Sequence, residues 1–383
     1  MSVNVQITNK KENDSKLLTF NISGIDVSYV NAIRRVIYTD ISIVVLKTSP
    51  YADFKDHIIT NTTRLSNEII GQRLSCIPIC LIDNPSFLDN YKDYQLELDV
   101  ENNTDNIMYV TTEDFKIKNK HTNTYLEQND IRKLFRPYIG NGTTEYFVDF
   151  VRLRPRLSDK IPGEKIKLKC DFAIGSHRDS GMFNVVSTCS YGYTPDHTTM
   201  KSVLESHEKL WKEQGKTPEE IEYDAKNWQL LEGLRYYIAN SFDFIIQSVG
   251  IYENDDIIDK ACDILASKLL ELSSNLDTNV ITITQSQTTM ENSYDIELDN
   301  EDYTVGNILN HEIYRLLYQN EKKVSYVGFK KIHPHDTKSL LRVAFANETD
   351  GEPQLKSYLK NIIELSVENI RSIQRYFSHS KSK

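Results

Sequence analysis

The chain has 383 residues, of which 39% are hydrophobic and 26% charged, and its formal net charge at pH 7 is −10. A length well above about 200 residues favours two or three domains, and the composition is typical of a folded protein rather than a disordered one. The acidic balance argues against a protein that binds nucleic acid on its own, because such proteins need a dominant basic surface.

The sequence also argues against secretion and membrane insertion. The five cysteines are scattered and odd in number, which favours reduced thiols over a disulfide framework. The N-terminal residues lack the charged and apolar regions of a signal peptide. The longest aliphatic run, residues 41–46, is far shorter than the about 20 residues that cross a bilayer. We therefore expect a nuclear or cytoplasmic protein.

The N-terminal segment predicts a hairpin followed by a helix. Apolar residues alternate over 3–7 and again over 18–22, with a polar stretch between them. Asp26 or Ser28 can then cap an amphipathic helix. The apolar stripe of this helix consists of Tyr29, Ile33, Val36 and Ile37. The aliphatic residues 41–46 follow as a strand.

The middle of the chain has a different pattern. Short apolar stretches alternate with polar turns, which predicts a mainly β domain of residues 51–196 inserted into the preceding one. Residues 197–239 form a helical insertion, expected to be a surface hairpin. Thr217 stands at an N-cap, Pro218 occupies the first helical position, and glutamates follow in the first turn.

The C-terminal part of the chain repeats the pattern of the N-terminal segment. A strand over 242–250 leads into a helix, and residues 275–279 form a predicted linker. Residues 280–383 contain strands, a helix capped by Asp302 or Thr304, and a long final helix. Because the same order of elements occurs twice, we predict an α+β fold. Two such halves can pair helix against helix, each covering the apolar face of the other.

Three segments carry a resemblance to a known family. Residues 31–37, Asn-Ala-Ile-Arg-Arg-Val-Ile, resemble the Asn-Ala-Leu-Arg-Arg signature of the larger α-like subunit of multisubunit DNA-directed RNA polymerases. Residues 61–79 begin Asn-Thr-Thr-Arg-Leu-Ser-Asn-Glu and are similar to a second run of that subunit. Residues 301–343 begin Glu-Asp-Tyr-Thr-Val-Gly-Asn and resemble the smaller α-like subunit, whose pattern is Glu-Asp-His-Thr-Leu-Gly-Asn.

The resemblance implies one polypeptide that fuses the two α-like subunits. Two RNA polymerase α-like dimerisation domains would pair as an intramolecular pseudo-dimer, the first split by the mainly β insert. Residues 1–50 and 240–274 would form the larger domain, and residues 280–383 the smaller one. Such fusions resemble those of large cytoplasmic DNA viruses, which would place the protein in the cytoplasm of an infected cell and in the virion.

The resemblance further implies a role in transcription without catalysis. The paired halves would form the platform on which the two large catalytic subunits assemble, together with small zinc-binding polymerase subunits. DNA and RNA would be contacted only indirectly, no membrane would be involved, and the chain would be a monomer within the complex. The alternative interpretation is a stand-alone dimerisation scaffold of a transcription regulator, which would be recovered without large partners.

Candidate site residues fall into three groups. Polar positions expected to contact the large subunits are Asn31, Arg34, Arg35, Glu68, Gln72 and Arg73. Apolar positions expected in the pseudo-dimer core are Ile33, Leu265, Leu269, Leu309, Ile363 and Ile370. Structural roles in turns are expected for Gly306, Asn307 and Pro334, because Gly permits close backbone approach and Asn can bond unpaired amides at a helix start.

We predict no cofactor, metal ion or catalytic residue. The sequence lacks the phosphate-binding loop, nucleophile elbow and zinc-protease motifs. Cys76 and Cys80 are close together, but no second cysteine pair completes a metal site, and His333 and His335 lack further ligands at suitable spacing. The most basic stretch, residues 152–169, is expected to be a solvated surface, with a partner or nucleic-acid contact as the alternative.

Overall fold

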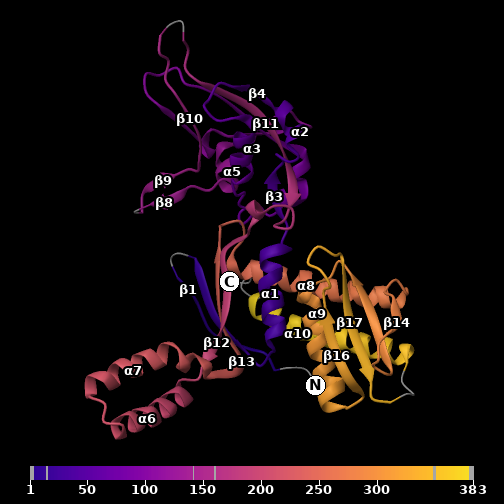
Figure 1. Cartoon of the computed structure of the whole chain (residues 1–383). Coiled ribbons are helices and arrows are strands. Elements are labelled where there is room, and N and C mark those ends of the chain that lie inside the picture. The colour runs from indigo at the N-terminus through magenta and orange to yellow at the C-terminus, as the bar shows by residue number, and fades with distance from the viewer. Residues whose placement is uncertain (1–3, 14–15, 141, 159–160, 348–350, 379–383) are drawn as a thin grey trace. The chain divides into compact units, whose positions relative to one another are not determined.

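The structure is a computed structural model that describes residues 4–13, 16–140, 142–158, 161–347 and 351–378 (Figure 1). The described residues form two compact units. Unit 1 is drawn from Met1–Val36, Thr188–Gln247 and Ile258–Lys383, and unit 2 from Ile37–Ser187 and Ser248–Ile257. The chain passes between the units within four elements, α1 (Val27–Thr39), β12 (Val186–Pro195), β13 (Tyr237–Ser248) and α8 (Asn254–Asp277).

The first sheet of unit 1 has the strand order β1-β2-β13-β12. Strands β1 (Gln6–Glu12) and β2 (Leu17–Ser23) form the predicted hairpin, although residue 3 of the expected first strand lies outside the described residues. Strand β2 also pairs with β13, which sets Phe20 opposite Phe244. Their rings stack with centroids 5.2 Å apart. Alternate residues of β2 therefore present one apolar face.

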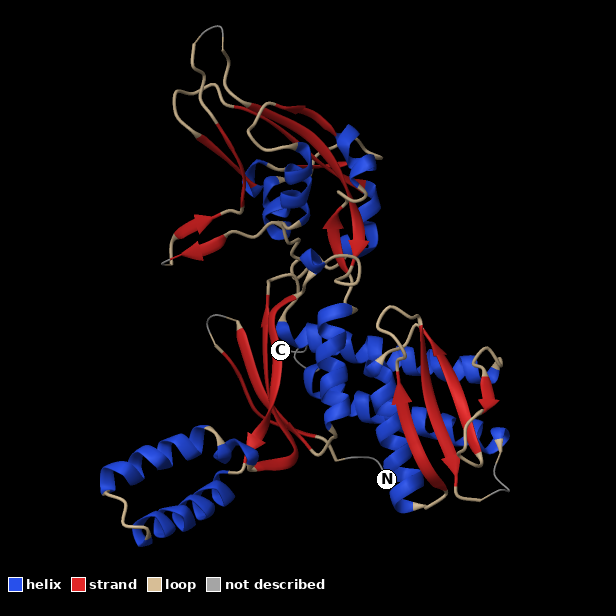
Figure 2. Cartoon of the chain, viewed as in Figure 1, coloured by secondary structure: helices blue, strands red, loops and turns tan. Residues whose placement is uncertain are grey.

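The second sheet of unit 1 has the order β14-β15-β17-β16. Its strands are β14 (Ile283–Gln285), β15 (Ser293–Asp299), β16 (Val324–Lys330) and β17 (Lys338–Phe345). Helix α9 (Tyr303–Ile313) continues into a π-helical segment, Tyr314–Asn320, and the last helix is α10 (Glu352–Ser378). Figure 2 shows the long helices of this unit between its two sheets. The apolar helix faces therefore lie in the interior.

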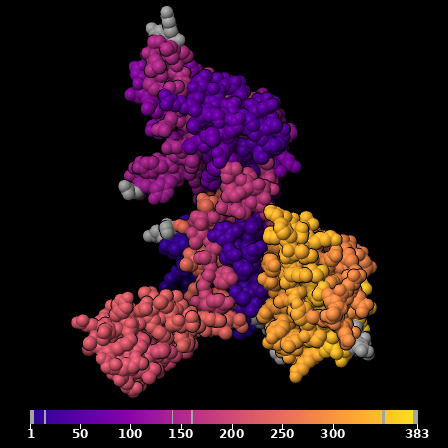
Figure 3. All heavy atoms as spheres, in the orientation of Figure 1, coloured from indigo at the N-terminus to yellow at the C-terminus, as the bar shows by residue number. Residues whose placement is uncertain are grey.

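Two helices of unit 1 form a hairpin between β12 and β13. Helix α6 (His197–Glu213) is capped by Asp196, and α7 (Pro218–Leu230) begins at the predicted N-cap Thr217, which forms a capping box with Glu220. The Trp228 side chain is buried, with its ring centroid 5.5 Å from that of His207. Figure 3 shows the hairpin as a separate lobe joined to the rest of its unit by a narrow neck. Both helices lie within residues 197–239, the range for which the sequence predicts a helical insertion.

Unit 2 is built around the long strand β11 (Lys165–Gly175), in a sheet of order β3-β11-β5-β7 with β4 also paired to β11. The remaining strands are β3 (Ile43–Leu46), β4 (Ile58–Asn61), β5 (Tyr94–Glu101), β6 (Met108–Thr111), β7 (Lys116–Asn119), β8 (Tyr138–Gly140), β9 (Thr144–Tyr146) and β10 (Asp149–Leu153). The helices are α2 (Tyr51–Phe54), α3 (Asn67–Ser75), α4 (Phe87–Asn90) and α5 (Gln128–Leu134). Strand β6 pairs with β10, and β8 with β9.

Two boundaries differ from the sequence-based expectations. The predicted linker 275–279 is shorter, because Leu276 is 3% exposed and continues the apolar stripe of α8 to Asp277. Residues 43–46, grouped with the first domain, pair instead with β11 of unit 2, where all four side chains are buried. Pairing with a distant strand is not encoded in the local pattern. The domain boundaries implied by the family resemblance stay a prediction.

Candidate functional site

The candidate residues of α1 lie at the edges of its buried face. Ile33 and Val36 are buried, whereas Asn31, Arg34 and Arg35 are half-buried. The Arg34 guanidinium donates through Nε and Nη2 to Asn31 Oδ1, at 3.1 and 3.0 Å. This contact, three residues apart on one helix, holds the Arg34 charge beside Asn31.

Arg35 connects α1 to the start of α9. Its Nη2 lies 2.6 Å from Asp302 Oδ2, and its Nε donates to Thr304 Oγ1 at 2.8 Å. Asp302 also caps α9, accepting a hydrogen bond from the Thr304 amide at 2.7 Å. Burial acts to raise the pKa of Asp302, but the hydrogen bonds from Thr304 and the Arg35 charge outweigh it and lower the pKa.

A buried polar network joins α1 to α9 and α10. The Tyr29 hydroxyl on α1 donates to Glu312 Oε1 on α9 at 2.9 Å. It also lies 3.1 Å from Ser366 Oγ and accepts from Asn369 Nδ2 at 3.2 Å, both on α10. Glu312 is 1% exposed and pairs with Arg315, at 2.6 Å. Burial and the neighbouring Glu312 charge raise the pKa of Tyr29, so its hydroxyl stays protonated as a donor.

Sequence reasoning missed this network, although a signal was present. Glu312 falls four residues after Ile308 on the buried face of α9, and Ser366 and Asn369 interrupt the apolar stripe of α10. A polar residue inside an apolar helix stripe must find a partner when it is buried. The stripes therefore indicate buried polar groups, but the identity of their partners depends on the tertiary packing.

The predicted core residues all lie in the interior of unit 1. The buried set comprises Ile33, Leu265, Leu269, Leu309, Ile363 and Ile370. Leu272 and Leu276 of α8 share a void of about 10 Å³ with Leu309 of α9 and Ile363 of α10. The end of α8 therefore packs against the helices of the C-terminal part, and the space between them is nearly filled.

Polar contacts border the apolar packing between α8 and α10. Gln374 Nε2 donates to Asp259 Oδ1 at 3.0 Å. Arg371 forms an ion pair with Asp263, and Lys360 forms one with Asp277. These carboxylates lie on α8 and the cations on α10, so the two helices carry complementary charges along one side. Such half-exposed pairs contribute less to stability than to alignment.

The three predicted turn residues have different surroundings. Gly306 is buried in α9, and a Cβ there would lie 2.3 Å from the ring of Phe329. Without a Cβ at Gly306, the backbone of α9 lies close to the Phe329 ring. Asn307 is half-buried in the same helix. Pro334 is exposed in the turn between β16 and β17, where the Asp336 amide donates to the His333 carbonyl at 3.1 Å.

Helix α3 in unit 2 carries the remaining candidate residues. Ser66 caps the helix by accepting from the Ile69 amide, and Glu68, Gln72 and Arg73 are all exposed. Hydrogen bonds from the Glu68 amide and from Ser66 lower the pKa of Glu68. Arg73 fastens the helix to β10, because its Nε and Nη2 donate to two backbone carbonyls at 2.6 and 2.9 Å. These three residues share one helix, whereas the α1 candidates belong to unit 1.

Comparison with known proteins identifies the family. The RNA polymerase Rpb3/Rpb11 dimerisation domain matches residues 19–269, which is well over half of the chain. The chain belongs to the Rpb3/Rpb11 dimerisation-domain family. It is also similar to DNA-directed RNA polymerases I and III subunit RPAC1 of Saccharomyces cerevisiae, with 24% identity over 290 residues. That alignment covers 67% of this chain and 83% of the yeast protein.

The Rpb3/Rpb11 match begins in β2 and ends within α8. It therefore includes Tyr29, Arg35 and the α3 residues. The partners of Tyr29 on α9 and α10, and those of Arg35 at the start of α9, follow after its end. Among the described residues of this family member, no three His, Cys, Asp or Glu side chains cluster as metal ligands would. No described helix has the length and apolar character needed to span a membrane.

Proposed function

We propose that this Rpb3/Rpb11-type chain is a non-catalytic assembly subunit of a DNA-directed RNA polymerase. The family match over residues 19–269 carries the proposal. The similarity to a yeast polymerase subunit over most of that protein's length supports it. In this role the chain binds other polymerase subunits and positions them, and RNA synthesis takes place on the two large catalytic subunits.

We further propose that residues 280–383 are the fused smaller α-like partner. The part of unit 1 before residue 280 and the part from residue 280 onward would then form a pseudo-dimer. The repeated combination of a sheet with two helices supports this proposal. So do the Arg35–Asp302 and Tyr29–Glu312 contacts, each of which joins the first part to the second. Fusion would hold the two parts at an effective concentration of roughly millimolar and fix their ratio at one to one.

Two surfaces are proposed to contact the large subunits. Asn31 and Arg34 would contribute from α1, and Glu68, Gln72 and Arg73 from α3. The α3 side chains are exposed and the α1 side chains half-buried. Accessible polar side chains on a well-packed helix can make directional contacts at an interface, and arginine is frequent among such contacts. Arg35 fits a different role, because its contacts to Asp302 and Thr304 stabilise the pairing of the two parts.

Purification from the natural source tests the polymerase role. The tagged chain would be isolated from its native or infected cells, its partners identified by mass spectrometry, and the material assayed for template-dependent RNA synthesis. We expect two partners above about 100 kDa and RNA-synthesising activity, a size that follows from the family resemblance. Recovery of the chain without such partners would contradict the proposal and favour a stand-alone dimerisation scaffold.

The fused architecture also supports a viral origin, with transcription in the cytoplasm of an infected cell and packaging into the virion. Small zinc-binding polymerase subunits are proposed as further partners. Mass spectrometry of purified particles from infected cells would detect this chain together with the large subunits. Its absence from particles that contain those subunits would contradict the virion proposal and leave the polymerase role intact.

A further inference from the structure

A cavity of about 670 Å³ opens in unit 2 beside α3, β6 and β10. Four arginines line it, Arg64, Arg73, Arg152 and Arg154. The carboxylates of Asp149 and Glu164 line it as well, so its lining carries four positive and two negative charges. The whole chain has a net charge of −10, so this local excess of positive charge opposes the balance of the molecule.

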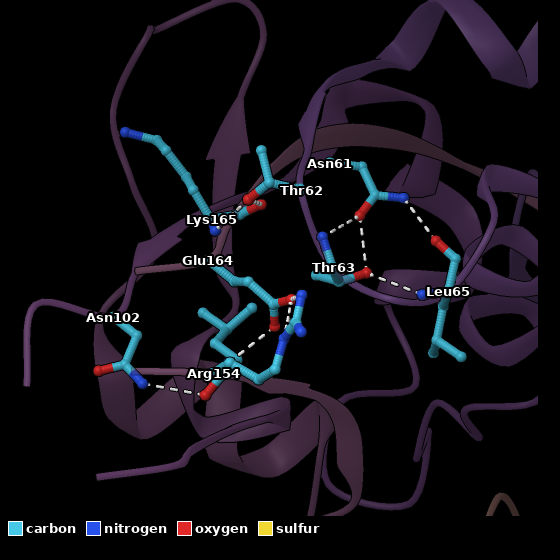
Figure 4. Close-up of polar contacts among 9 residues, drawn as sticks. Asn61, Thr62, Thr63, Leu65, Asn102, Arg154, Glu164 and Lys165 are labelled. Atoms are coloured by element: carbon cyan, nitrogen blue, oxygen red, sulfur yellow. Dashed lines mark hydrogen bonds and ion pairs between the residues drawn. The ribbon is translucent and has the colours of Figure 1, made fainter. Parts of the chain in front are cut away.

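Two of the arginines are committed to structural contacts. Arg154 lies 2.5 Å from Glu164, whose side chain is largely buried, and Figure 4 shows the two side chains against one another. Arg73 donates to the backbone carbonyls of Phe150 and Asp149. Both guanidinium groups hold the cavity wall together, so part of their hydrogen-bonding capacity is already used within the chain.

Arg64 is presented by a preorganised loop. Asn61 Nδ2 donates to the Leu65 carbonyl at 2.9 Å, and Asn61 Oδ1 accepts from the Thr63 amide at 3.0 Å and hydroxyl at 2.7 Å (Figure 4). The Leu65 amide donates in turn to Thr63 Oγ1. Within the part of the chain that the structure describes, no side chain pairs with the Arg64 guanidinium. A fixed loop with an unpaired cation lowers the entropy cost of binding an anion.

Arg152 is placed beside an exposed aromatic ring. It lies on β10 directly opposite Tyr109 of β6, and opposite residues of an antiparallel pair project to the same face. Among the described residues, Arg152 also has no hydrogen-bond or ion-pair partner for its side chain. Tyr109 is 54% exposed and Ile107 is 57% exposed, and both line the cavity. The cavity thus joins guanidinium groups to an apolar surface.

The neighbouring lysines do not extend this positive surface. Lys165, Lys167 and Lys169 form ion pairs at 2.6 to 3.0 Å with Glu101, Asp99 and Glu97 on the adjacent strand β5. The basic stretch of the sequence is therefore largely neutralised within its own sheet, and residues 159–160 of it lie outside the described residues. A nucleic-acid backbone needs a row of available cations, whereas two carboxylates need only two guanidinium forks.

We propose that this cavity binds an acidic segment of a partner protein. Carboxylates of the segment pair with Arg64 and Arg152, and an adjacent apolar side chain packs on Tyr109 and Ile107. A planar guanidinium binds a carboxylate through two parallel hydrogen bonds, which gives direction as well as charge. The proposal does not depend on the polymerase role, because it concerns only the chemistry of the cavity.

Binding of a defined peptide to the full chain tests the proposal. The probe is fluorescein-labelled Asp-Glu-Phe-Asp-Glu, followed by fluorescence anisotropy. We expect saturable binding, and we expect Arg64→Ala and Arg152→Ala each to raise Kd by about tenfold or more. Arg152→Lys keeps the positive charge but loses the two-pronged guanidinium, so its Kd should fall between those of the wild type and Arg152→Ala. Because both arginines are exposed, circular dichroism and melting temperature should be unchanged.

Matched probes and a control variant separate the alternatives. Arg375→Ala removes an exposed arginine that lines no part of the cavity and should leave Kd unchanged. The amide peptide Asn-Gln-Phe-Asn-Gln and the glycine peptide Asp-Glu-Gly-Asp-Glu should both bind more weakly. No saturable binding up to about 1 mM, or an equal loss in Arg375→Ala, would overturn the proposal. So would preferential binding of an oligothymidylate of about ten nucleotides, which would assign the cavity to nucleic acid.

Discussion

At the scale of single residues, the Tyr29 hydroxyl tests whether buried polar contacts stabilise the interface. Tyr29→Phe keeps the ring and removes the donor to Glu312, which stays buried with Arg315 as its remaining partner. We expect the free energy of unfolding to fall by about 1–3 kcal/mol, because a buried acceptor loses a hydrogen bond. Urea denaturation followed by circular dichroism measures this change.

Tyr223→Phe is the matched control for Tyr29→Phe. Tyr223 is 72% exposed on α7, so removal of its hydroxyl should change the unfolding free energy by less than about 0.5 kcal/mol. Equal stability of the two variants would show that the Tyr29 network is not a stabilising contact. A double-mutant cycle with Glu312→Gln would then identify whether Arg315 alone satisfies the carboxylate.

Asp302 gives a prediction with a defined pH dependence. Its pKa is lowered in the folded state, so the ionised carboxylate stabilises the fold above its unfolded pKa of about 3.9. That contribution is lost as the pH falls through the lower folded value. Asp302→Asn should therefore be less stable than the wild type at pH 6, and the difference should shrink below about pH 4. Urea midpoints measured from pH 3 to about 7 check this.

A matched substitution shows whether the pH effect belongs to the Arg35 contact. Asp336→Asn removes an exposed carboxylate in the turn between β16 and β17, so its difference from the wild type should stay small across the same range. A parallel pH dependence in both variants would show a general charge effect. Asp302 itself was among the helix caps expected from the sequence, whereas its arginine partner, 267 residues away, was not.

At the scale of elements, Gly306 determines how closely α9 approaches its own sheet. A Cβ at this position would meet the ring of Phe329 at 2.3 Å, and that ring packs edge-on against Tyr303. Gly306→Ala should therefore displace the ring or the helix and reduce the free energy of unfolding by about 1–3 kcal/mol, despite the better helix propensity of Ala. Thermal unfolding measures the effect.

Gly192→Ala provides the comparison, because nothing lies within 4 Å of a Cβ added at Gly192. This exposed position in β12 should accept the methyl group with little change in melting temperature. If Gly306→Ala is tolerated equally well, Phe329 can move at no cost and the close approach is not required. Additional substitution of Phe329 by Leu should restore part of the loss if the ring causes it.

Local signals predicted most elements, whereas contacts between distant segments set the boundaries and the polar partners. The N-cap at Thr217 and the long final helix α10 depend on neighbours within one helix, and both were predicted from the sequence. The pairing of residues 43–46 with β11 and the contact of Arg73 with β10 depend on residues far away in the chain. The arginine cavity was missed for the same reason, because Arg64 and Arg152 meet only through the fold of unit 2.

At the scale of the whole molecule, the packing of α8 against the C-terminal part implies that the two parts recognise each other without a covalent link. Cutting the chain between residues 279 and 280 separates α1 and α8 from α9 and α10. We expect the two pieces, coexpressed with a tag on one, to be purified together in equal amounts. Buried apolar contacts and the Tyr29 network would hold the pieces together, since both lie between one piece and the other.

Two neighbouring leucines on α8 make this prediction specific. Leu269 is completely buried, so Leu269→Asp places an unpaired charge in the interior at a cost of several kcal/mol and should abolish copurification. Leu270 is 48% exposed, and Leu270→Asp should leave the pieces associated. In the uncut chain the effective concentration of one part at the other opposes dissociation, so Leu269→Asp should appear there as reduced stability. Separate purification of the unmodified pieces would mean that the chain connection, rather than the interface, holds the two parts together.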